Sequence, residues 1–281
     1  MKVTSKMVPN EPLAVLVDGQ PLVAAPDWPL DRGLHYGDGL FETMIARGGH
    51  IRFLFLHKAR LAAGCARLRI NLAHEPLWKQ AVALAQQHEN AVLKLLVTRG
   101  SMSQRGYGIS GDEPGRSLLF VYPAPQAGQP ADVSVVTLQA KLAENAALAG
   151  IKHCNRLEQV LARMELGVNA FEGLMGSSSG HLISGTMSNV FLDTDVGLVT
   201  PALQLCGIAG VTRAVVLREA AAMGIPVQVA NVAMTALDDC RGAFLTNVRM
   251  GVLPVARLNG RELATGDHAR ALATRVASLE N

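Results

Sequence analysis

The chain has 281 residues, of which 49% are hydrophobic and 17% charged, and its formal net charge is +3. This composition supplies enough apolar material for a sizeable core and excludes a wholly disordered chain. It also argues against a nucleic-acid surface, because the positive excess is small and no run of Lys and Arg concentrates it. At this length we expect two domains.

The cysteines and the N-terminus bear on the compartment. Cys65, Cys154, Cys206 and Cys240 are too far apart for a C-x-x-C pair or a zinc knuckle, so no metal site is expected. Scattered thiols are typical of a reducing compartment. The first residues contain no apolar stretch of signal-peptide length, and no window approaches about 18 apolar residues. We therefore expect a cytoplasmic protein without a membrane partner.

The first part of the chain predicts hairpins followed by helices and further strands. Asp18-Gly19 and Gly48-Gly49 are turn signals between apolar runs. A polar, Gly-rich segment at 99–115 predicts a long loop, and such loops are more often functional than idle. The expected strands are 13–17, 21–25, 40–47, 50–54, 92–98 and 117–122, and the expected helices are 55–70 and 77–88.

A Pro- and Gly-rich segment at 123–130 predicts an interdomain linker. It divides the chain into a small N-terminal α/β domain at 1–122 and a larger C-terminal domain at 131–281. Thr235, three residues before Asp238, resembles a capping box. In the C-terminal domain we expect strands at 132–138, 171–175, 182–183, 190–192, 227–229 and 244–246, and helices at 155–166 and 210–223.

Lys152 is the first candidate for chemistry. It follows Gly150-Ile151 and precedes a helix with one apolar face. A lysine at the edge of an apolar segment can lose water, which disfavours its ammonium form and frees the lone pair for a Schiff base. The same pattern is also typical of a lysine that extends from a strand end into solvent.

Three further segments could bind an anion. Arg60, early in a helix, could reach a phosphate with its rigid fork. Val211 and Thr212 begin a helix after a Gly-rich approach, where free N–H groups attract anions. Asn247 and Val248 end a strand and could add backbone N–H groups. Taken singly, these segments also fit a surface arginine, an ordinary helix start and a plain turn.

In this order the motifs resemble the class IV aminotransferase family, the pyridoxal 5′-phosphate (PLP) enzymes of fold type IV, from Val17 to Val255. The resemblance implies an α/β fold whose larger C-terminal domain is a pseudo-barrel. It implies that Lys152 is the Schiff-base lysine, that Arg60 binds phosphate, and that the segments at 211–212 and 247–248 complete the phosphate cup. It also implies a homodimer whose site lies between the domains, near the partner's loop.

Within the family, the stretches 151–159 and 98–108 are most similar to the aminodeoxychorismate lyases. That similarity implies conversion of 4-amino-4-deoxychorismate to 4-aminobenzoate and pyruvate in folate biosynthesis. Arg105 could clamp a substrate carboxylate, although a solvated loop arginine fits equally well. The candidates for lining the substrate are Tyr36, Thr43, Arg105, His153 and Asn155.

Two positions depart from the family pattern. Ser184 stands where the family usually carries a Glu that pairs with the protonated ring nitrogen of PLP, and a hydroxyl can only hydrogen-bond there. We infer a weaker electron sink, which suits an elimination better than a transamination. Leu157 stands where branched-chain aminotransferases usually carry Tyr. The alternatives are an aminotransferase for D- or branched-chain amino acids, and a PLP-carrying binding protein without catalysis.

Overall fold

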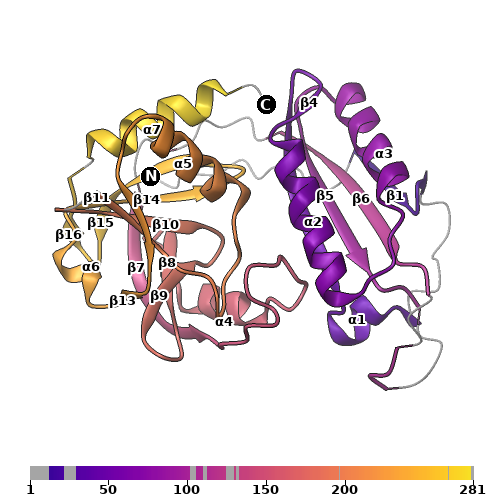
Figure 1. The fold of residues 1–281 in the computed structure, drawn as a ribbon, viewed down its shortest axis with the longest axis horizontal. Coiled ribbons are helices and arrows are strands. Elements are labelled where there is room, and N and C mark those ends of the chain that lie inside the picture. Colours follow the sequence, from indigo (N-terminus) through magenta and orange to yellow (C-terminus); the bar gives the residue numbers. More distant parts are fainter. Residues whose placement is uncertain are drawn as a thin grey trace. The chain divides into compact units, whose positions relative to one another are not determined.

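The computed structural model describes residues 13–21, 30–101, 106–109, 113–124, 130, 133–195, 197–264 and 266–279. The chain forms two compact units (Figure 1). The first comprises residues 1–128, 152–155 and 281, and the second comprises residues 129–151 and 156–280. Residues 152–155, which we expected in the C-terminal domain, therefore belong to the first unit. Most of the expected linker lies outside the described residues.

The first unit is built on an antiparallel sheet with the strand order β2-β1-β6-β5-β3-β4. β5 shows why this sequence forms strands: Leu93, Leu95 and Val97 are fully buried, while Lys94 between them is exposed. α2 and α3 pack against this sheet. The bounds are β1 Ala14–Val17, β2 Gln20–Pro21, α1 Arg32–Tyr36, β3 Gly39–Arg47, β4 His50–Ile51, α2 Leu54–Leu68, α3 His74–Gln87, β5 Ala91–Thr98 and β6 Arg116–Pro123.

The second unit contains a ten-stranded mixed sheet. β7 pairs in parallel with both β8 and β15, whereas β10, β14 and β15 are antiparallel neighbours. The bounds are β7 Val133–Leu142, α4 Leu157–Glu165, β8 Glu172–Ser177, β9 His181–Gly185, β10 Asn189–Thr194, β11 Gly197–Pro201, α5 Val211–Ala222, β12 Val227–Ala230, β13 Val232–Ala233, α6 Ala236–Asp239, β14 Gly242–Asn247, β15 Gly251–Leu258, β16 Arg261–Glu262 and α7 Asp267–Ser278.

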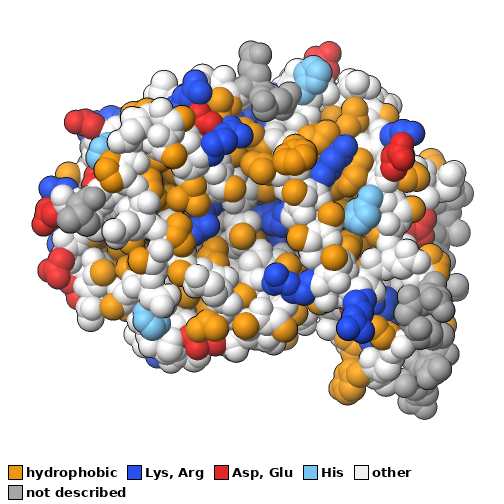
Figure 2. Space-filling view, in the orientation of Figure 1, with side chains coloured by type: hydrophobic (Ala, Val, Ile, Leu, Met, Phe, Trp, Pro, Cys, Tyr) orange, Lys and Arg blue, Asp and Glu red, His pale blue; other side chains and the backbone are white. Residues whose placement is uncertain are grey.

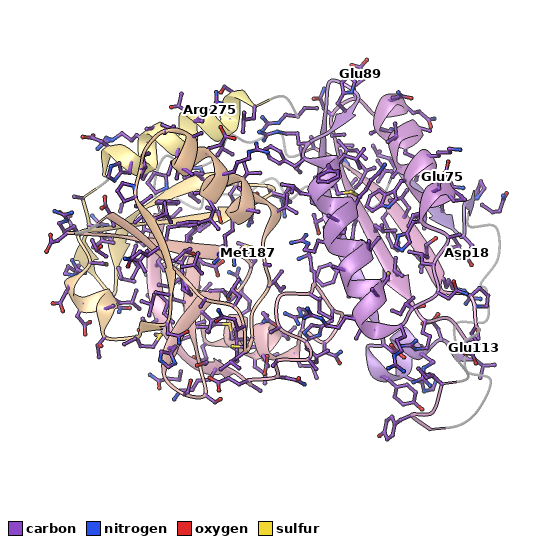
Figure 3. The ribbon with its side chains drawn as sticks, viewed as in Figure 1. Asp18, Glu75, Glu89, Glu113, Met187 and Arg275 are labelled. Carbon is purple, nitrogen blue, oxygen red and sulfur yellow. The ribbon has the colours of Figure 1, made fainter. Side chains whose placement is uncertain are left out.

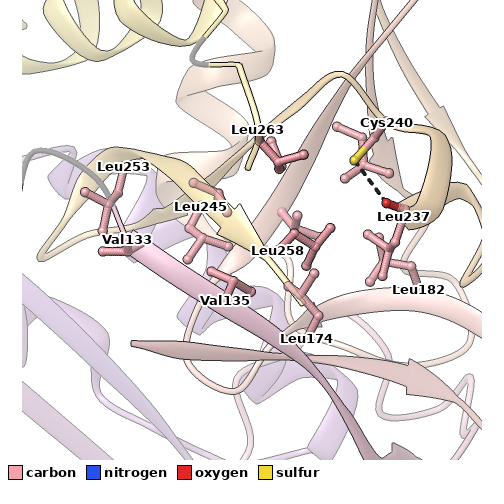
Figure 4. Packing of buried hydrophobic residues seen from close by; sticks show 14 of the residues in the cluster. Val133, Val135, Leu174, Leu182, Leu237, Cys240, Leu245, Leu253, Leu258 and Leu263 are labelled. Carbon is pink, nitrogen blue, oxygen red and sulfur yellow. Dashed lines mark hydrogen bonds between the residues drawn. The ribbon is translucent and has the colours of Figure 1, made fainter. Parts of the chain in front are cut away.

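The core of the second unit lies between strands that are distant in sequence. Val133 and Val135 of β7 pack with Leu174 of β8, Leu245 of β14 and Leu253 of β15 (Figure 4). α4 packs on β7, α7 packs on β15, and α5 contacts β14 and α7. The core therefore fixes the ends of β9, β10 and β14 and the start of α5, which are the segments that matter below.

Most expected elements are present, with a few differences. The hairpin at Asp18-Gly19 forms, but part of its expected return strand, 22–25, lies outside the described residues. The expected capping box at Thr235 is wrong, since its side chain makes no capping hydrogen bond to the short α6. The sequence patterns did not predict α1, β11, β13, β15, β16 and α7. Among the described helices, none has both the length and the apolarity needed to cross a membrane.

Candidate functional site

Lys152 is held at the edge of the first unit's sheet. The backbone N–H of Phe41 donates to the carbonyl of Lys152 at 2.9 Å, and the N–H of Cys154 donates to Gly39 at 2.9 Å. His153 forms an antiparallel bridge with Leu40. The segment thus pairs with the first part of β3, on the side opposite β5, which explains why it packs with the first unit. The Lys152 Nζ lies 4.1 Å from the centre of the Phe41 ring.

Arg60 on α2 is held by a buried carboxylate. Its Nε donates to Oε1 of Glu42 at 2.7 Å, and its Nη2 donates to Oε2 at 2.5 Å. His57, one turn earlier on the same helix, places Nδ1 2.6 Å from Oε2 of Glu42. The Glu42 and His57 side chains are almost completely buried, and Arg60 is 13% exposed. Glu42 therefore orients one edge of the guanidinium group that the sequence assigned to phosphate.

Charges and burial act in opposite directions on this cluster. Burial alone would raise the pKa of Glu42, but the charge and hydrogen bonds of Arg60, with the hydrogen bond from His57, lower it to about 2. Burial lowers the pKa of His57 and outweighs its hydrogen bond with Glu42. His57 is thus a neutral imidazole beside an ionised carboxylate. Its buried Nε2 has no hydrogen-bond partner among the described residues.

The candidate substrate residues of the first unit lie in α1, on β3 and in the segment after Lys152. Asn155 Nδ2 donates to the carbonyl of Gly37 at 3.2 Å. The Tyr36 ring lies 5.2 Å from the ring of Tyr107, which is 84% exposed. Thr43 lies on the same face of β3 as Phe41, because residues along a strand alternate. Arg105 lies outside the described residues.

Arg32, which the sequence reasoning missed, fixes the loop segment at 106–108. Its guanidinium group donates to the carbonyls of Gly106, Tyr107 and Gly108 at 3.2–3.3 Å. Its Nε donates to Asp38 at 2.9 Å, and the hydrogen bonds and charges of Arg99 and Arg32 hold the pKa of Asp38 below its usual value against the effect of burial. A guanidinium fork suits such convergent acceptors.

In the second unit, α5 begins with unused hydrogen-bonding groups. Its N-cap is Gly210, so no side chain caps the first turn, where Val211 and Thr212 lie. Thr212 is 2% exposed and Thr246 is 1% exposed, and each buries a hydroxyl without a partner among the described residues. A buried hydroxyl without a partner costs free energy, so it marks a place for a ligand oxygen.

The turn after β14 is fixed by its own asparagine. Asn247 Oδ1 accepts from the backbone N–H groups of Arg249 and Met250 at 2.9 and 2.8 Å. Its Nδ2 donates to the carbonyl of Met187 at 3.2 Å. The Asn247 side chain is thus structural, and a contact with an anion there would come from the backbone at Val248.

Ser184 lies at the end of β9 and is 7% exposed. Its hydroxyl donates to the carbonyl of Gly185 at 2.9 Å, which leaves oxygen lone pairs available. The following residues, 185–188, fold over the buried carboxylate of Glu172. Asn189 then donates from Nδ2 to Ile208 at 2.9 Å, so this loop contacts the segment that leads into α5.

Comparison with known proteins gives the family. The model for class IV amino-transferases matches residues 39–258. The chain belongs to this family. A curated aminodeoxychorismate lyase from Vibrio harveyi is 34% identical over 240 residues, which are 83% of this chain and 87% of that protein. Among solved structures, a 4-amino-4-deoxychorismate lyase from Pseudomonas aeruginosa superposes with a TM-score of 0.89 at 39% identity, covering 95% of this chain and 100% of that one.

A branched-chain aminotransferase from Thermoproteus uzoniensis has a TM-score of 0.83 at 19% identity, covering 95% and 94% of the two chains, and shows the shared fold. This class IV chain therefore has the two-domain fold of PLP enzymes of type IV, and PLP is its cofactor. The expectations for family, fold and cofactor are confirmed. The buried Thr212 and Thr246 hydroxyls and the uncapped start of α5 fit a phosphate group.

Besides Arg32, the sequence reasoning missed three supporting residues of the candidate site. Glu42 and Glu172 are buried carboxylates, and Thr246 lay inside a segment of which only the next two residues were chosen. A carboxylate within an otherwise apolar strand, such as Glu42 in β3, was the available signal, because such a group is buried only with partners.

Proposed function

We propose that this chain is a PLP-dependent aminodeoxychorismate lyase, which cleaves 4-amino-4-deoxychorismate to 4-aminobenzoate and pyruvate for folate biosynthesis. The observation that carries the proposal is the 39% identity with the Pseudomonas aeruginosa lyase over 95% of the chain, against 19% for the aminotransferase of similar fold. Both named lyases match almost their whole length.

Lys152 carries the chemistry in this proposal. It would hold the cofactor through its side-chain amine, and with the substrate bound its free amine would be the base that takes the proton from the amine-bearing ring carbon. PLP supplies the electron sink for the pair left at that carbon. The carbon–oxygen bond to the enolpyruvyl group breaks as the ring becomes aromatic. Lys152 then returns a proton to the methylene carbon that becomes the methyl group of pyruvate.

The other residues bind and orient. Arg60, with one edge of its guanidinium group fixed by Glu42, binds the phosphate. Thr212, Val211 and the turn at Asn247–Val248 supply the neutral donors of the phosphate cup. Ser184 contacts the ring nitrogen.

The substrate contacts in this proposal come from α1, from β3 and from the segment after Lys152. Tyr36, Thr43, His153 and Asn155 line the substrate, and Arg105 binds one of its carboxylates. Arg32 would fix the shape of this region, since it holds the carbonyls of residues 106–108.

The test is a product assay. Purified protein supplied with PLP and 4-amino-4-deoxychorismate should release 4-aminobenzoate and pyruvate in equal amounts, and Lys152→Ala should reduce the rate by about 10³-fold or more. Lys94→Ala, a change of an exposed lysine on β5, is the matched control. Unchanged turnover in Lys152→Ala would contradict the role of the lysine, and no product from the unaltered chain would contradict the reaction.

Transamination is the second candidate, because curated relatives at 26–27% identity are a D-alanine aminotransferase and a putative branched-chain aminotransferase. Ser184 argues against it, since a hydroxyl does not hold the ring nitrogen protonated by charge. Ser184→Glu should therefore raise the rate of amine transfer from D-alanine to a 2-oxo acid relative to the lyase rate. A lower ratio would contradict this reasoning.

We also propose a homodimer, and the outer face of α4 supports it. Leu157, Leu161 and Met164 on this face are 58–76% exposed, and apolar side chains reach the surface over α4 (Figure 2). The acidic residues of the helix point into their own unit: Glu158 accepts from the N–H of Ala143, and Glu165 accepts from two N–H groups of β7. A helix whose acidic residues bond to their own unit while its large apolar side chains are exposed is typical of an interface.

Light scattering after gel filtration tests the dimer. The unaltered chain should have twice the monomer mass of 29.8 kDa, and Leu161→Lys should shift it toward the monomer. Val229→Lys, at another exposed apolar residue of the same unit, should not. A monomeric unaltered chain would contradict the proposal.

We place the enzyme in the cytoplasm, since its cysteines form no disulfide among the described residues.

A further inference from the structure

Glu172 is a carboxylate buried without a role in the reaction proposed above. It lies in β8, whose residues are all buried, and its own exposure is 0%. Its oxygens accept from the N–H and the hydroxyl of Thr186 at 3.1 and 2.5 Å, from the N–H of Met187 at 3.2 Å, and from the hydroxyl of Ser188 at 3.0 Å. Met187 is labelled in Figure 3. One carboxylate thus gathers the donors of a whole loop.

The loop is folded tightly over this carboxylate. A Cβ atom at Gly185 would lie 2.3 Å from the Ser188 hydroxyl and 2.9 Å from the side chain of Glu172, so only glycine fits there. An ionised carboxylate buried without such donors would be very costly. The donors and the carboxylate therefore require each other, and the loop has one favoured conformation.

Both ends of the loop enter the candidate cofactor site. Ser184 immediately precedes Gly185, and Asn189 immediately follows Ser188. Asn189 donates to Ile208, and a Cβ atom at Gly210 would lie 2.0 Å from Asn189 Oδ1, so Asn189 lies directly against the N-cap of α5. The loop at 185–188 therefore connects the end of β9, which carries Ser184, to the start of α5, which carries Thr212.

We propose that Glu172 is a positioning residue of the cofactor site, which fixes Ser184 against the ring nitrogen and Asn189 against the start of α5. The inference rests on the proposed function, because it assumes PLP at Lys152 with its ring nitrogen at Ser184. Position 184 carries a hydroxyl instead of a carboxylate, and this hydroxyl donates to the carbonyl of Gly185. Glu172 positions it through the loop at 185–188.

The experiment compares binding of PLP with binding of 1-deaza-PLP, in which a carbon replaces the ring nitrogen. A titration of the visible absorbance of the Lys152 adduct gives the dissociation constants, and borohydride reduction of a separate sample shows that the adduct is on Lys152. The unaltered chain should prefer PLP. In Glu172→Gln one oxygen becomes an N–H donor that faces the donors of the loop, so PLP affinity should fall about 10- to 100-fold. The preference for PLP over the analogue should disappear, because the phosphate contacts are the same for both.

Glu144→Gln is the matched control. Glu144 is a carboxylate that accepts from Ser179 in the neighbouring turn, away from the 185–188 loop, and the preference should survive its change. If Glu172→Gln does not fold, Ser188→Ala removes one donor of the same network and should reduce the preference by a smaller factor.

A folded Glu172→Gln protein with the unaltered preference overturns the proposal. Equal binding of the two compounds by the unaltered chain overturns it as well, because no nitrogen contact is then there to be positioned. An unaltered chain that forms no reducible adduct with PLP overturns the proposed function instead, so the two failures are distinguishable.

Discussion

Each unit buries a glutamate that supports the candidate site, Glu42 in the first unit and Glu172 in the second, and the two have different partners. In the first unit Glu42 lies between the guanidinium of Arg60 and the imidazole of His57. In the second unit Glu172 receives hydrogen bonds from backbone N–H and hydroxyl groups, with the nearest Arg163 nitrogen 3.7 Å away. One carboxylate fixes a cationic side chain and the other fixes a loop.

This difference follows from the group that each glutamate holds in place, a guanidinium group in the first unit and a loop in the second. A guanidinium group needs a fixed counter-ion when it is largely buried, so a side chain from the adjacent strand suffices. A loop has several donors that point inward, and a carboxylate can accept from all of them at once. The first unit should therefore be sensitive to charge and pH, whereas the second should be sensitive to the loss of individual hydroxyl groups.

The largest expected effect is on the stability of the first unit. Glu42→Gln should lower the free energy of unfolding by about 3–5 kcal/mol, because it leaves a buried guanidinium group without its counter-ion. Urea denaturation measures the loss. The control is Glu75→Gln, since Glu75 pairs with Lys79 on the surface, where such a pair contributes less than about 1 kcal/mol. A similar loss in both variants would contradict the buried ion pair.

The dependence of the unfolding free energy on pH should separate the contributions of His57 and Glu42. The pKa of His57 in the folded chain lies below its ordinary value of 6.5, so stability is lost as the pH falls below 6.5, where only the unfolded chain takes up the proton. The pKa of Glu42 falls from 4.5 to about 2, so its contribution of about 3 kcal/mol is present above pH 4.5 and is lost as the pH falls toward 2.

Urea midpoints between pH 8 and pH 3 test this order. His57→Gln should reduce the loss between pH 6.5 and 4.5, leaving the part that belongs to His74, whose pKa burial also lowers, and should keep the loss below 4.5. A profile that remains flat down to pH 4.5 in the unaltered chain would show that His57 is not held neutral.

The smallest expected effect is on the second unit, where the change removes one buried hydroxyl. Thr212→Val should leave the stability of the cofactor-free chain unchanged or raise it by up to about 1 kcal/mol, because the hydroxyl has no partner among the described residues. The same change should weaken PLP binding about tenfold. Thermal unfolding without cofactor and a PLP titration measure the two effects.

Thr200→Val is the matched control, since Thr200 is equally buried but donates to the carbonyl of Val190 at 2.8 Å. It should lose about 1 kcal/mol of stability and leave the PLP affinity unchanged. Were Thr212→Val to behave like Thr200→Val, the hydroxyl at 212 would be structural.

Local patterns were sufficient for the parts of this chain that depend on near neighbours. The alternation in β3 and β5, the Gly-Gly turn between β3 and β4, and the start of α5 follow from side-chain period and turn chemistry. The order of the motifs was sufficient for the family, which the comparisons confirm. The individual site residues stay predictions.

Contacts between distant segments were decided by the tertiary structure alone. Glu42 meets Arg60 eighteen residues later, and Glu172 meets a loop fourteen to sixteen residues later, and no local period links such pairs. The placement of residues 152–155 with the first unit depends on pairing with β3. The apolar face of α4 was predictable, but its exposure was not, because Glu158 and Glu165 turn inward to accept from backbone N–H groups of their own unit. A sequence specifies which side chains are apolar or charged, whereas packing decides which partners they reach.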